Sequence, residues 1–116
     1  MKVVSLDRVT KTKVDMEGAE KVYKQVPIGQ SDGSPTFSIR VFSLEPDGHT
    51  PHHRHLSEHL NYVIEGHGAL VTESGDEREI KQGDFVLVLP NEVHQYRNKS
   101  KDRLLMMICA VPKEYE

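Results

Sequence analysis

Histidines are the residues of this chain with the clearest chemical potential. Seven occur among the 116 residues, and five of them lie between His49 and His59. Imidazole is the side chain most often found as a metal ligand, so a cluster of this density favours a metal site. Side chains two residues apart share one face of a β-strand, and His53 and His55 are therefore expected to point together. His94 follows a Pro-Asn-Glu turn and begins another expected strand, from which it can join them.

Not every histidine is expected to belong to this site, because a histidine-rich segment can also be solvated surface. His49 and His52 are interpreted as residues without a role in the site. His67 lies between two glycines at an expected turn and receives the same interpretation. His59 follows a short bend and opens the next expected strand, where it can meet His53 and His55 from a neighbouring position.

Short strands must position these residues. From residue 37 onward the sequence is rich in β-branched and aromatic residues, with turn signals roughly every 8–12 residues. Residues 45–48 form one of the expected turns. The pattern predicts an all-β sandwich or barrel. Strands are expected over residues 37–44, 60–65, 69–73, 77–80, 85–89 (buried), 93–97 and 103–111.

The first part of the chain is less clearly patterned. We expect one short strand near residues 3–6. Residues 19–26 have apolar side chains at a spacing that suits a helical turn as well as a strand. Residues 27–35 contain glycines, serines and two prolines, and are expected to form a loop.

Composition limits the class of protein. A chain of 116 residues corresponds to one domain, and a formal net charge of −3 argues against non-specific binding to nucleic acid or to an anionic membrane. No apolar run approaches the roughly 20 residues of a membrane-spanning helix. The single cysteine, Cys109, excludes an internal disulfide, and the reducing cytoplasm is the simplest location.

The middle of the chain resembles the cupins, small β-barrel proteins that hold a metal in the barrel. Their first motif is Gly, five residues, His-x-His, three or four residues, Glu, six residues, Gly, and it matches residues 47–66. Asp47 stands at the first Gly position, and His53 and His55 supply His-x-His. His59 stands where the glutamate is usual. The closing glycine has the correct spacing.

The second cupin motif, Gly, five residues, Pro-x-Gly, two residues, His, three residues, Asn, resembles residues 83–98. His94 and the final Asn98 lie at the correct distances from the opening glycine. Pro90 lies one place late, and Asn91 takes the glycine position. This exchange is physically reasonable because asparagine tolerates a positive φ better than most residues.

The resemblance implies a single jelly-roll barrel (a double-stranded β-helix) over residues 1–116, with N-terminal strands and a loop in residues 1–36 and the barrel core in residues 37–112. It also implies the four-histidine type of metal site. Glu58 is the alternative to His59, but the two point to opposite faces of a strand and the family spacing selects His59. The ligand set implied by the resemblance is His53, His55, His59 and His94.

The implied cofactor is one divalent transition metal ion, namely Mn, Fe, Ni, Cu or Zn, with Mn favoured by the resemblance. Four neutral imidazoles leave its 2+ charge uncompensated, which favours an anionic or chelating ligand. Four ligands on an octahedral ion also leave two adjacent positions open, as in a catalytic site.

Further side chains are expected around the metal. Alternation along the strands places some on the histidine face, and the resemblance places others inward. Arg40 has two interpretations that the sequence leaves open: an inward cation that binds a substrate carboxylate with two hydrogen bonds, or a surface arginine in an ion pair. The substrate-pocket candidates are Arg40, Asn61, Tyr96, Met107 and Cys109.

The resemblance implies a metal-dependent enzyme acting on a small organic acid or enol-type substrate. Dioxygen-dependent cleavage, decarboxylation and isomerisation are the expected reactions. A non-catalytic metal-bearing sensor or carrier barrel is the alternative, and a metal that only stabilises the barrel is a third. The expected partners are a small-molecule ligand and a second copy of the chain, with residues 1–10 as candidates for a shared strand in a homodimer. Neither nucleic acid nor a membrane is expected as a partner.

Overall fold

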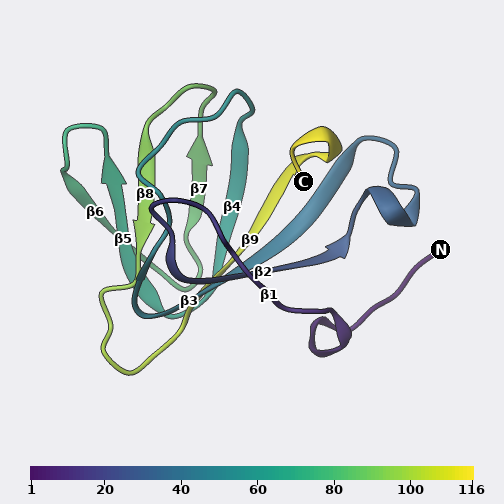
Figure 1. The fold of residues 1–116 in the computed structure, drawn as a ribbon, viewed down its shortest axis with the longest axis horizontal. Coiled ribbons are helices and arrows are strands. Elements are labelled where there is room, and N and C mark those ends of the chain that lie inside the picture. Colours follow the sequence, from purple (N-terminus) through teal and green to yellow (C-terminus); the bar gives the residue numbers. More distant parts are fainter.

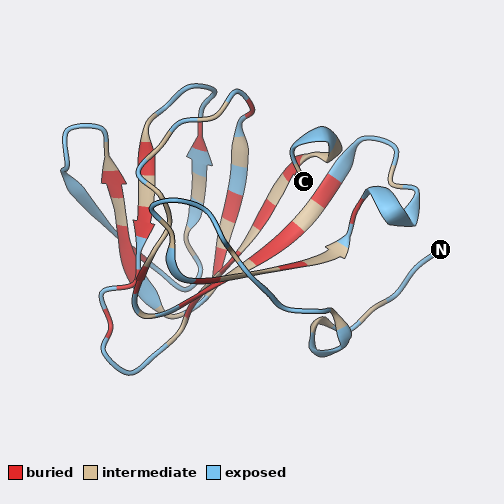
Figure 2. Cartoon of the chain, viewed as in Figure 1, coloured by how far each residue is buried: buried red, intermediate tan, exposed pale blue.

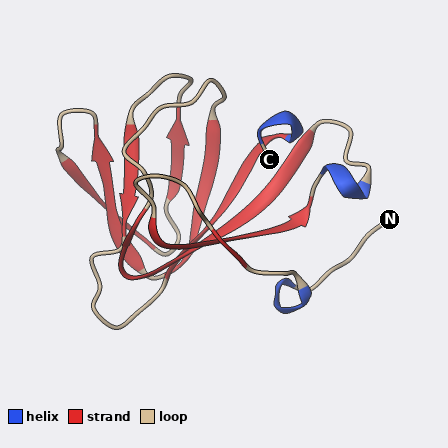
Figure 3. Ribbon diagram, in the orientation of Figure 1, coloured by secondary structure: helices blue, strands red, loops and turns tan.

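The computed structural model describes residues 1–116 and contains β-strands with three short 3₁₀ turns (Figure 3). None of its helices is long and apolar enough to cross a lipid bilayer. The 3₁₀ turns are η1 (Leu6–Arg8), η2 (Gln30–Asp32) and η3 (Lys113–Tyr115). The strands are β1 (Thr12–Lys13), β2 (Glu20–Ile28), β3 (Phe37–His49), β4 (His59–Glu65), β5 (His67–Thr72), β6 (Glu77–Lys81), β7 (Phe85–Val88), β8 (His94–Arg97) and β9 (Leu105–Pro112).

The nine strands belong to one antiparallel sheet. Along its main path the strand order is β6-β5-β8-β3-β9-β4-β7, and β2 adds to β3 with β1 beside it. The order of the strands in the sheet differs from their order along the sequence, so strands distant in sequence become neighbours. The sheet curls, as Figure 1 shows, with β4 and then β7 beyond β9 at one end of the strand order, and β5 and then β6 beyond β8 at the other. This architecture confirms the predicted all-β barrel class.

Strict alternation of side chains builds the core. In β9 every second residue is buried, because successive side chains of a strand point to opposite faces of the sheet (Figure 2). The buried residues Leu105 and Met107 face side chains from five other strands. The cluster at the centre of the core comprises Val22, Leu44, Val63, Ile80, Tyr96, Leu105 and Met107.

The N-terminal expectations are partly wrong. Residues 3–6 form no strand, and η1 follows instead. The physical reason is visible in Gln25, whose Nε2 donates to the carbonyl oxygens of Leu6 and Val9 at 2.9 Å each. A side chain, rather than a neighbouring strand, therefore bonds the carbonyl groups of Leu6 and Val9. The ambiguity over residues 19–26 resolves as strand β2, which pairs with both β1 and β3.

The expected turn at residues 45–48 is also wrong, because β3 continues through it to His49. Asp47 adopts a left-handed backbone with φ 64°, and the pairing of β2 with β3 shifts in register at this point. The turn-forming residues are thus accommodated as an irregularity within one long strand. At the second motif, Asn91 has φ 65°, as predicted for a residue in the glycine position.

Strand β7 corrects a third expectation, that of a buried strand at residues 85–89. It lies at one end of the sheet path, pairs with β4 alone and ends at Val88. Val88 is buried, but Phe85 is 82% exposed and Leu87 is 54% exposed. An apolar run therefore marks an edge strand here, with one face open.

Candidate metal centre

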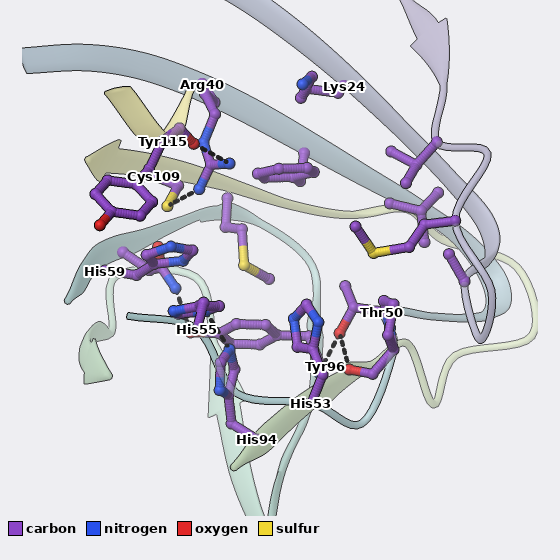
Figure 4. A pocket seen from close by; sticks show the side chains of 18 of the residues that line it. Lys24, Arg40, Thr50, His53, His55, His59, His94, Tyr96, Cys109 and Tyr115 are labelled. Atoms are coloured by element: carbon purple, nitrogen blue, oxygen red, sulfur yellow. Dashed lines mark hydrogen bonds between the residues drawn. The ribbon is translucent and has the colours of Figure 1, made fainter. Parts of the chain in front are cut away.

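Three histidines converge in one cavity of the protein (Figure 4). The nearest ring nitrogens of His53, His55 and His94 all lie within 4.8 Å of one another. The backbone explains the convergence, since the amide of His53 donates to the carbonyl of His94 at 3.1 Å and the reverse bond is 2.9 Å. This isolated bridge joins the His-x-His segment to the first residue of β8. The three histidines predicted from these two segments are thus brought together.

Hydrogen bonds define the orientation of two of these rings. His55 Nδ1 lies 2.9 Å from the carbonyl oxygen of Ser57, and His94 Nδ1 lies 2.8 Å from that of Glu92. A carbonyl oxygen only accepts, so both Nδ1 atoms are the donors. In a neutral ring, each Nε2 then carries a lone pair.

The two Nε2 atoms of His55 and His94 lie only 3.2 Å apart. With both Nδ1 positions protonated, no hydrogen lies between these two acceptors when the rings are neutral, and their lone pairs repel. A metal cation between them satisfies both lone pairs at once, while the Nδ1 bonds fix the rings as they do in known metal sites. The residues present therefore fit a bound metal.

His59 lies beside this cluster but does not join it. Its ring stacks on that of His55, with centroids 3.6 Å apart and planes at 13°. It is the first residue of β4 and faces the same cavity, whereas its neighbour Glu58 is exposed. The backbone thus turns His59 rather than Glu58 inward. The structure shows three clustered histidines with a fourth packed against one of them.

Burial favours the neutral form of His53, His59 and His94 by lowering the pKa of each ring. Burial lowers the pKa of His59 to about 3, and the nearby side chains of His55 and Arg40 add to the effect because a second positive charge beside them is unfavourable. Burial likewise lowers the pKa of His94 to about 4, although the hydrogen bond to Glu92 opposes the shift. The pKa of His53 is lowered for the same reason. Neutral imidazole is the form that binds metal.

The remaining histidines lie outside the cluster. His52 is exposed, with Nε2 2.8 Å from the carbonyl oxygen of Thr72, and His67 is exposed at the start of β5. His49 is half-buried against the carbonyl of Thr50. None of the three lines the cavity that contains the cluster.

That cavity has a volume of about 440 Å³. Much of its wall is apolar and comes from β2, β3 and β9, including Val22, Phe42 and Met107. Within its lining, Asn61 Nδ2 donates to the hydroxyl oxygen of Tyr96, and both residues are buried. All five substrate-pocket candidates line the cavity: Arg40, Asn61, Tyr96, Met107 and Cys109.

Arg40 lies inside the barrel, not on its surface. It pairs with Cys109 across β3 and β9, and its Nη2 donates to the sulfur at 3.0 Å. Burial raises the pKa of the Cys109 thiol, although Arg40 opposes this shift. Arg40 takes part in none of the salt bridges of the structure, so the interpretation as a surface ion pair is wrong.

Sequence reasoning missed one wall of the cavity. Residues 12–16 line it, and so do Val22 and Lys24 of β2 and Tyr115 of η3. The alternation of Val22 and Lys24 was a usable signal once residues 19–26 are taken as a strand. The placement of Tyr115 depends on the path of the chain after β9, for which the sequence carries no signal.

Comparisons with known proteins agree with this geometry. The family model described as "Cupin domain" matches residues 40–111. Among solved structures, the polyketide cyclase RemF from Streptomyces resistomycificus superposes with a TM-score of 0.91 and 28% identity, covering 97% of this chain and 79% of that one. This similarity, with the all-β sheet, supports the predicted jelly-roll barrel.

Two curated relatives match shorter segments. An uncharacterised protein from Methanocaldococcus jannaschii is 31% identical over 61 residues, which are 53% of this chain and 48% of that protein. Gentisate 1,2 dioxygenase 1 from Aquipseudomonas alcaligenes is 33% identical over 57 residues, 49% of this chain and 16% of that protein. The matches thus span less than half the length of either relative.

Proposed function

The chain belongs to the cupin domain family, and from this premise we propose that it is a metal-dependent enzyme acting on a chelating carbonyl compound. The observation that carries the proposal is the 3.2 Å approach of His55 Nε2 to His94 Nε2, with both lone pairs directed at the same space. His53 is the third proposed ligand. His59, which faces the same cavity, is proposed as the fourth.

A bound divalent ion supplies Lewis acidity, which polarises carbonyl oxygens and stabilises the negative charge of an enolate. The proposed ligands are all neutral, so they leave the charge of the ion uncompensated and favour an anionic chelate. Imidazole ligands suit Fe, Ni, Cu and Zn, and the family resemblance adds Mn, which we propose as the favoured metal.

The chain's own residues support such a substrate in two ways. The apolar wall from Phe42, Val22 and Met107 excludes water from the carbon skeleton. Burial raises the pKa of Tyr96, so its hydroxyl stays protonated. Because Asn61 donates to that hydroxyl, the proton of Tyr96 remains free to form a hydrogen bond with a substrate oxygen.

Cyclisation or isomerisation of a 1,3-dicarbonyl compound is the proposed reaction. A carbon next to a carbonyl group, such as the terminal methyl carbon of a linear trione, loses a proton and attacks the carbonyl carbon of the same molecule that closes a six-membered ring, and water leaves. No oxidant is consumed. The similarity to a polyketide cyclase over 97% of the chain supports this choice, and adds cyclisation to the reactions expected from sequence.

Dioxygen-dependent cleavage is the second candidate. The observation that favours it is the 33% identity with a gentisate dioxygenase over 57 residues. It differs from cyclisation in consuming dioxygen, and this difference makes the two reactions separable. A binding or sensor barrel, the non-catalytic alternative, would return its ligand unchanged.

The proposal is tested with heptane-2,4,6-trione, a linear compound that cyclises to an aromatic product by losing one water. Protein loaded with Mn²⁺ is expected to form this product without oxygen, and protein treated with a chelator is not. Mass spectrometry measures the product. Conversion only in the presence of oxygen would support the dioxygenase and contradict the cyclase. No metal-dependent conversion in either atmosphere would contradict both.

A further inference from the structure

We infer that Arg40 is a specificity-determining residue that binds a carboxylate group of the substrate, in the same cavity as the histidine cluster. The inference deepens the proposed function. It rests on that function in one respect, namely that the carboxylate and the oxygens that chelate the metal belong to the same substrate molecule. It narrows the substrate class to carbonyl compounds that carry a carboxylate.

The first support is the burial of a charge without a counterion. Arg40 is only 8% exposed, and no salt bridge of the structure includes it. An arginine stays protonated in proteins, so it cannot escape the cost of burial by losing its proton. A buried charge without a partner is among the most expensive arrangements in a protein. An anionic ligand would supply the missing partner.

The second support is the state of its hydrogen-bond donors. The guanidinium has five N–H groups. Nη2 donates to the Cys109 sulfur at 3.0 Å, which is a weak acceptor, and Nη1 reaches the Tyr115 carbonyl only at 3.4 Å. The buried Nε has no partner at all. The protein thus holds the guanidinium in place but leaves several of its N–H donors without a good acceptor.

The third support is its fixed position. The guanidinium carbon lies 4.9 Å from the centroid of the Phe42 ring, which supports the cation from one side. Figure 4 shows Arg40 beside Cys109, on the side of the cavity where His59 lies. Across the sheet, Arg40 pairs with Cys109 and Cys109 pairs with Asn61, two residues after His59. The cation and the proposed metal site therefore share one space.

The charge of the cavity agrees with an anionic ligand. The charged residues that line it, apart from the histidines, are Lys13, Lys24 and Arg40 with Asp15 as the only acid. A bound metal ion adds further positive charge. A carboxylate can accept hydrogen bonds from the two terminal nitrogens of Arg40 in parallel, the arrangement in which arginine is most selective.

The test compares two ligands that differ in a carboxylate. The compound 4,6-dioxoheptanoate carries a 1,3-dicarbonyl group and a carboxylate, and heptane-2,4-dione carries the 1,3-dicarbonyl group alone. Isothermal titration of the Mn²⁺-loaded protein measures both dissociation constants. The wild type is expected to bind the carboxylate ligand on the order of 10- to 100-fold more tightly, as for hydrogen bonds to charged groups.

Variants separate Arg40 from the general charge of the protein. Arg40→Met is expected to abolish the preference while leaving the affinity for heptane-2,4-dione unchanged, and Arg40→Lys is expected to retain part of it. Arg78→Met removes an exposed positive charge on β6 and should leave the preference intact. A wild type without preference, or an Arg40→Met variant that keeps it, would overturn the inference. Circular dichroism verifies folding, and Arg40→Lys serves if Arg40→Met fails to fold.

A second measurement distinguishes failure of this inference from failure of the proposed function. Benzoate, which cannot chelate through a dicarbonyl group, is titrated into metal-free protein. Binding that disappears in Arg40→Met supports the carboxylate site even if neither diketone responds to metal. If both dicarbonyl ligands bind only to the metal-loaded protein and substitution of Arg40 changes neither dissociation constant, the proposed function stands and the inference about Arg40 is rejected.

Discussion

At the residue scale, two backbone carbonyl groups determine how the rings of His55 and His94 are oriented in the site. Those of Ser57 and Glu92 each accept a hydrogen bond from an Nδ1 atom, which leaves the Nε2 atoms of His55 and His94 facing each other. The sequence could predict that His53, His55 and His94 meet, because residue type and motif spacing carry that information, but it also placed His59 among the ligands. It could not predict that His59 stacks on His55, since ring packing depends on the local path of β4.

Arg40 illustrates the same limit. Its position within a strand is readable from sequence, but whether it faces solvent or the barrel depends on register. The partners that distinguish the two interpretations, Cys109 and Phe42, are provided by the pairing of β3 with β9 and by the path of β3 itself.

Tyr96 and Asn61 give a testable case of buried polar pairing. The hydroxyl of Tyr96 accepts from Asn61 Nδ2, and Asn61 Oδ1 already has no partner. Tyr96→Phe should therefore destabilise the fold by about 1–3 kcal/mol, because it leaves the buried side-chain amide of Asn61 without a hydrogen-bond acceptor. Urea denaturation measures the change. Combining it with Asn61→Leu should recover much of the loss, and a purely additive double variant would contradict the pairing.

At the element scale, β3 shows why strands are easier to predict than their ends. Glu45-Pro46-Asp47-Gly48 has the composition of a turn, yet the strand passes through it. Pairing with β2 at Leu44 and His49, and with β8 at His49, outweighs local turn preference. Likewise the apolar sequence of β7 predicted a buried strand, although one of its faces lies open.

The irregularity at Asp47 predicts a clear pattern of stability. Its φ of 64° disfavours β-branched residues strongly and glycine not at all. Asp47→Val should lower the free energy of unfolding by about 1–2 kcal/mol, whereas Asp47→Gly should leave it unchanged or raise it. Chemical denaturation of both variants measures the difference. Equal effects of valine and glycine would show that the backbone is not left-handed in solution.

The 3₁₀ turn η3 is linked to the barrel through Glu116. The hydrogen bond from Ser38 Oγ, at 2.6 Å, and that from the Gln30 amide hold the pKa of Glu116 below its ordinary value of 4.5. A lowered pKa stabilises the fold at pH values above 4.5, and this stabilisation is lost as the pH falls through the folded pKa.

Glu116→Gln should therefore lower the melting temperature at pH 7 and have progressively less effect below pH 4.5. Thermal melts of variant and wild type across this range measure the difference. Glu114→Gln is the matched control, because Glu114 is exposed in the same turn. A Glu116→Gln penalty that does not shrink at low pH would contradict the role of its charge.

At the scale of the whole molecule, the exposed apolar face of β4 and β7 is the feature that the single chain does not explain. Leu60 lies opposite Leu87, and both are more than half exposed, as is Phe85. Exposed apolar edges favour association. We predict a homodimer in which a second copy covers this face.

Light scattering after size-exclusion chromatography measures this directly. The wild type should have twice the chain mass of 13.2 kDa, and Phe85→Lys with Leu87→Lys should shift it to the monomer. Phe37→Lys, at an exposed apolar residue of β3, should have no effect. A monomeric wild type would reject the dimer. A double variant that remains dimeric would assign the interface elsewhere, for example to residues 1–10.

The central claim is that His53, His55 and His94 hold a metal ion, and the metal content of the purified protein tests it most directly. Elemental analysis is expected to find one divalent transition metal per chain in the wild type and in His52→Ala, since His52 is exposed outside the cluster. His94→Ala should lose the metal while retaining the β-sheet signal in circular dichroism. A wild type that neither contains nor binds a transition metal, or a His94→Ala variant that keeps it, would contradict the account.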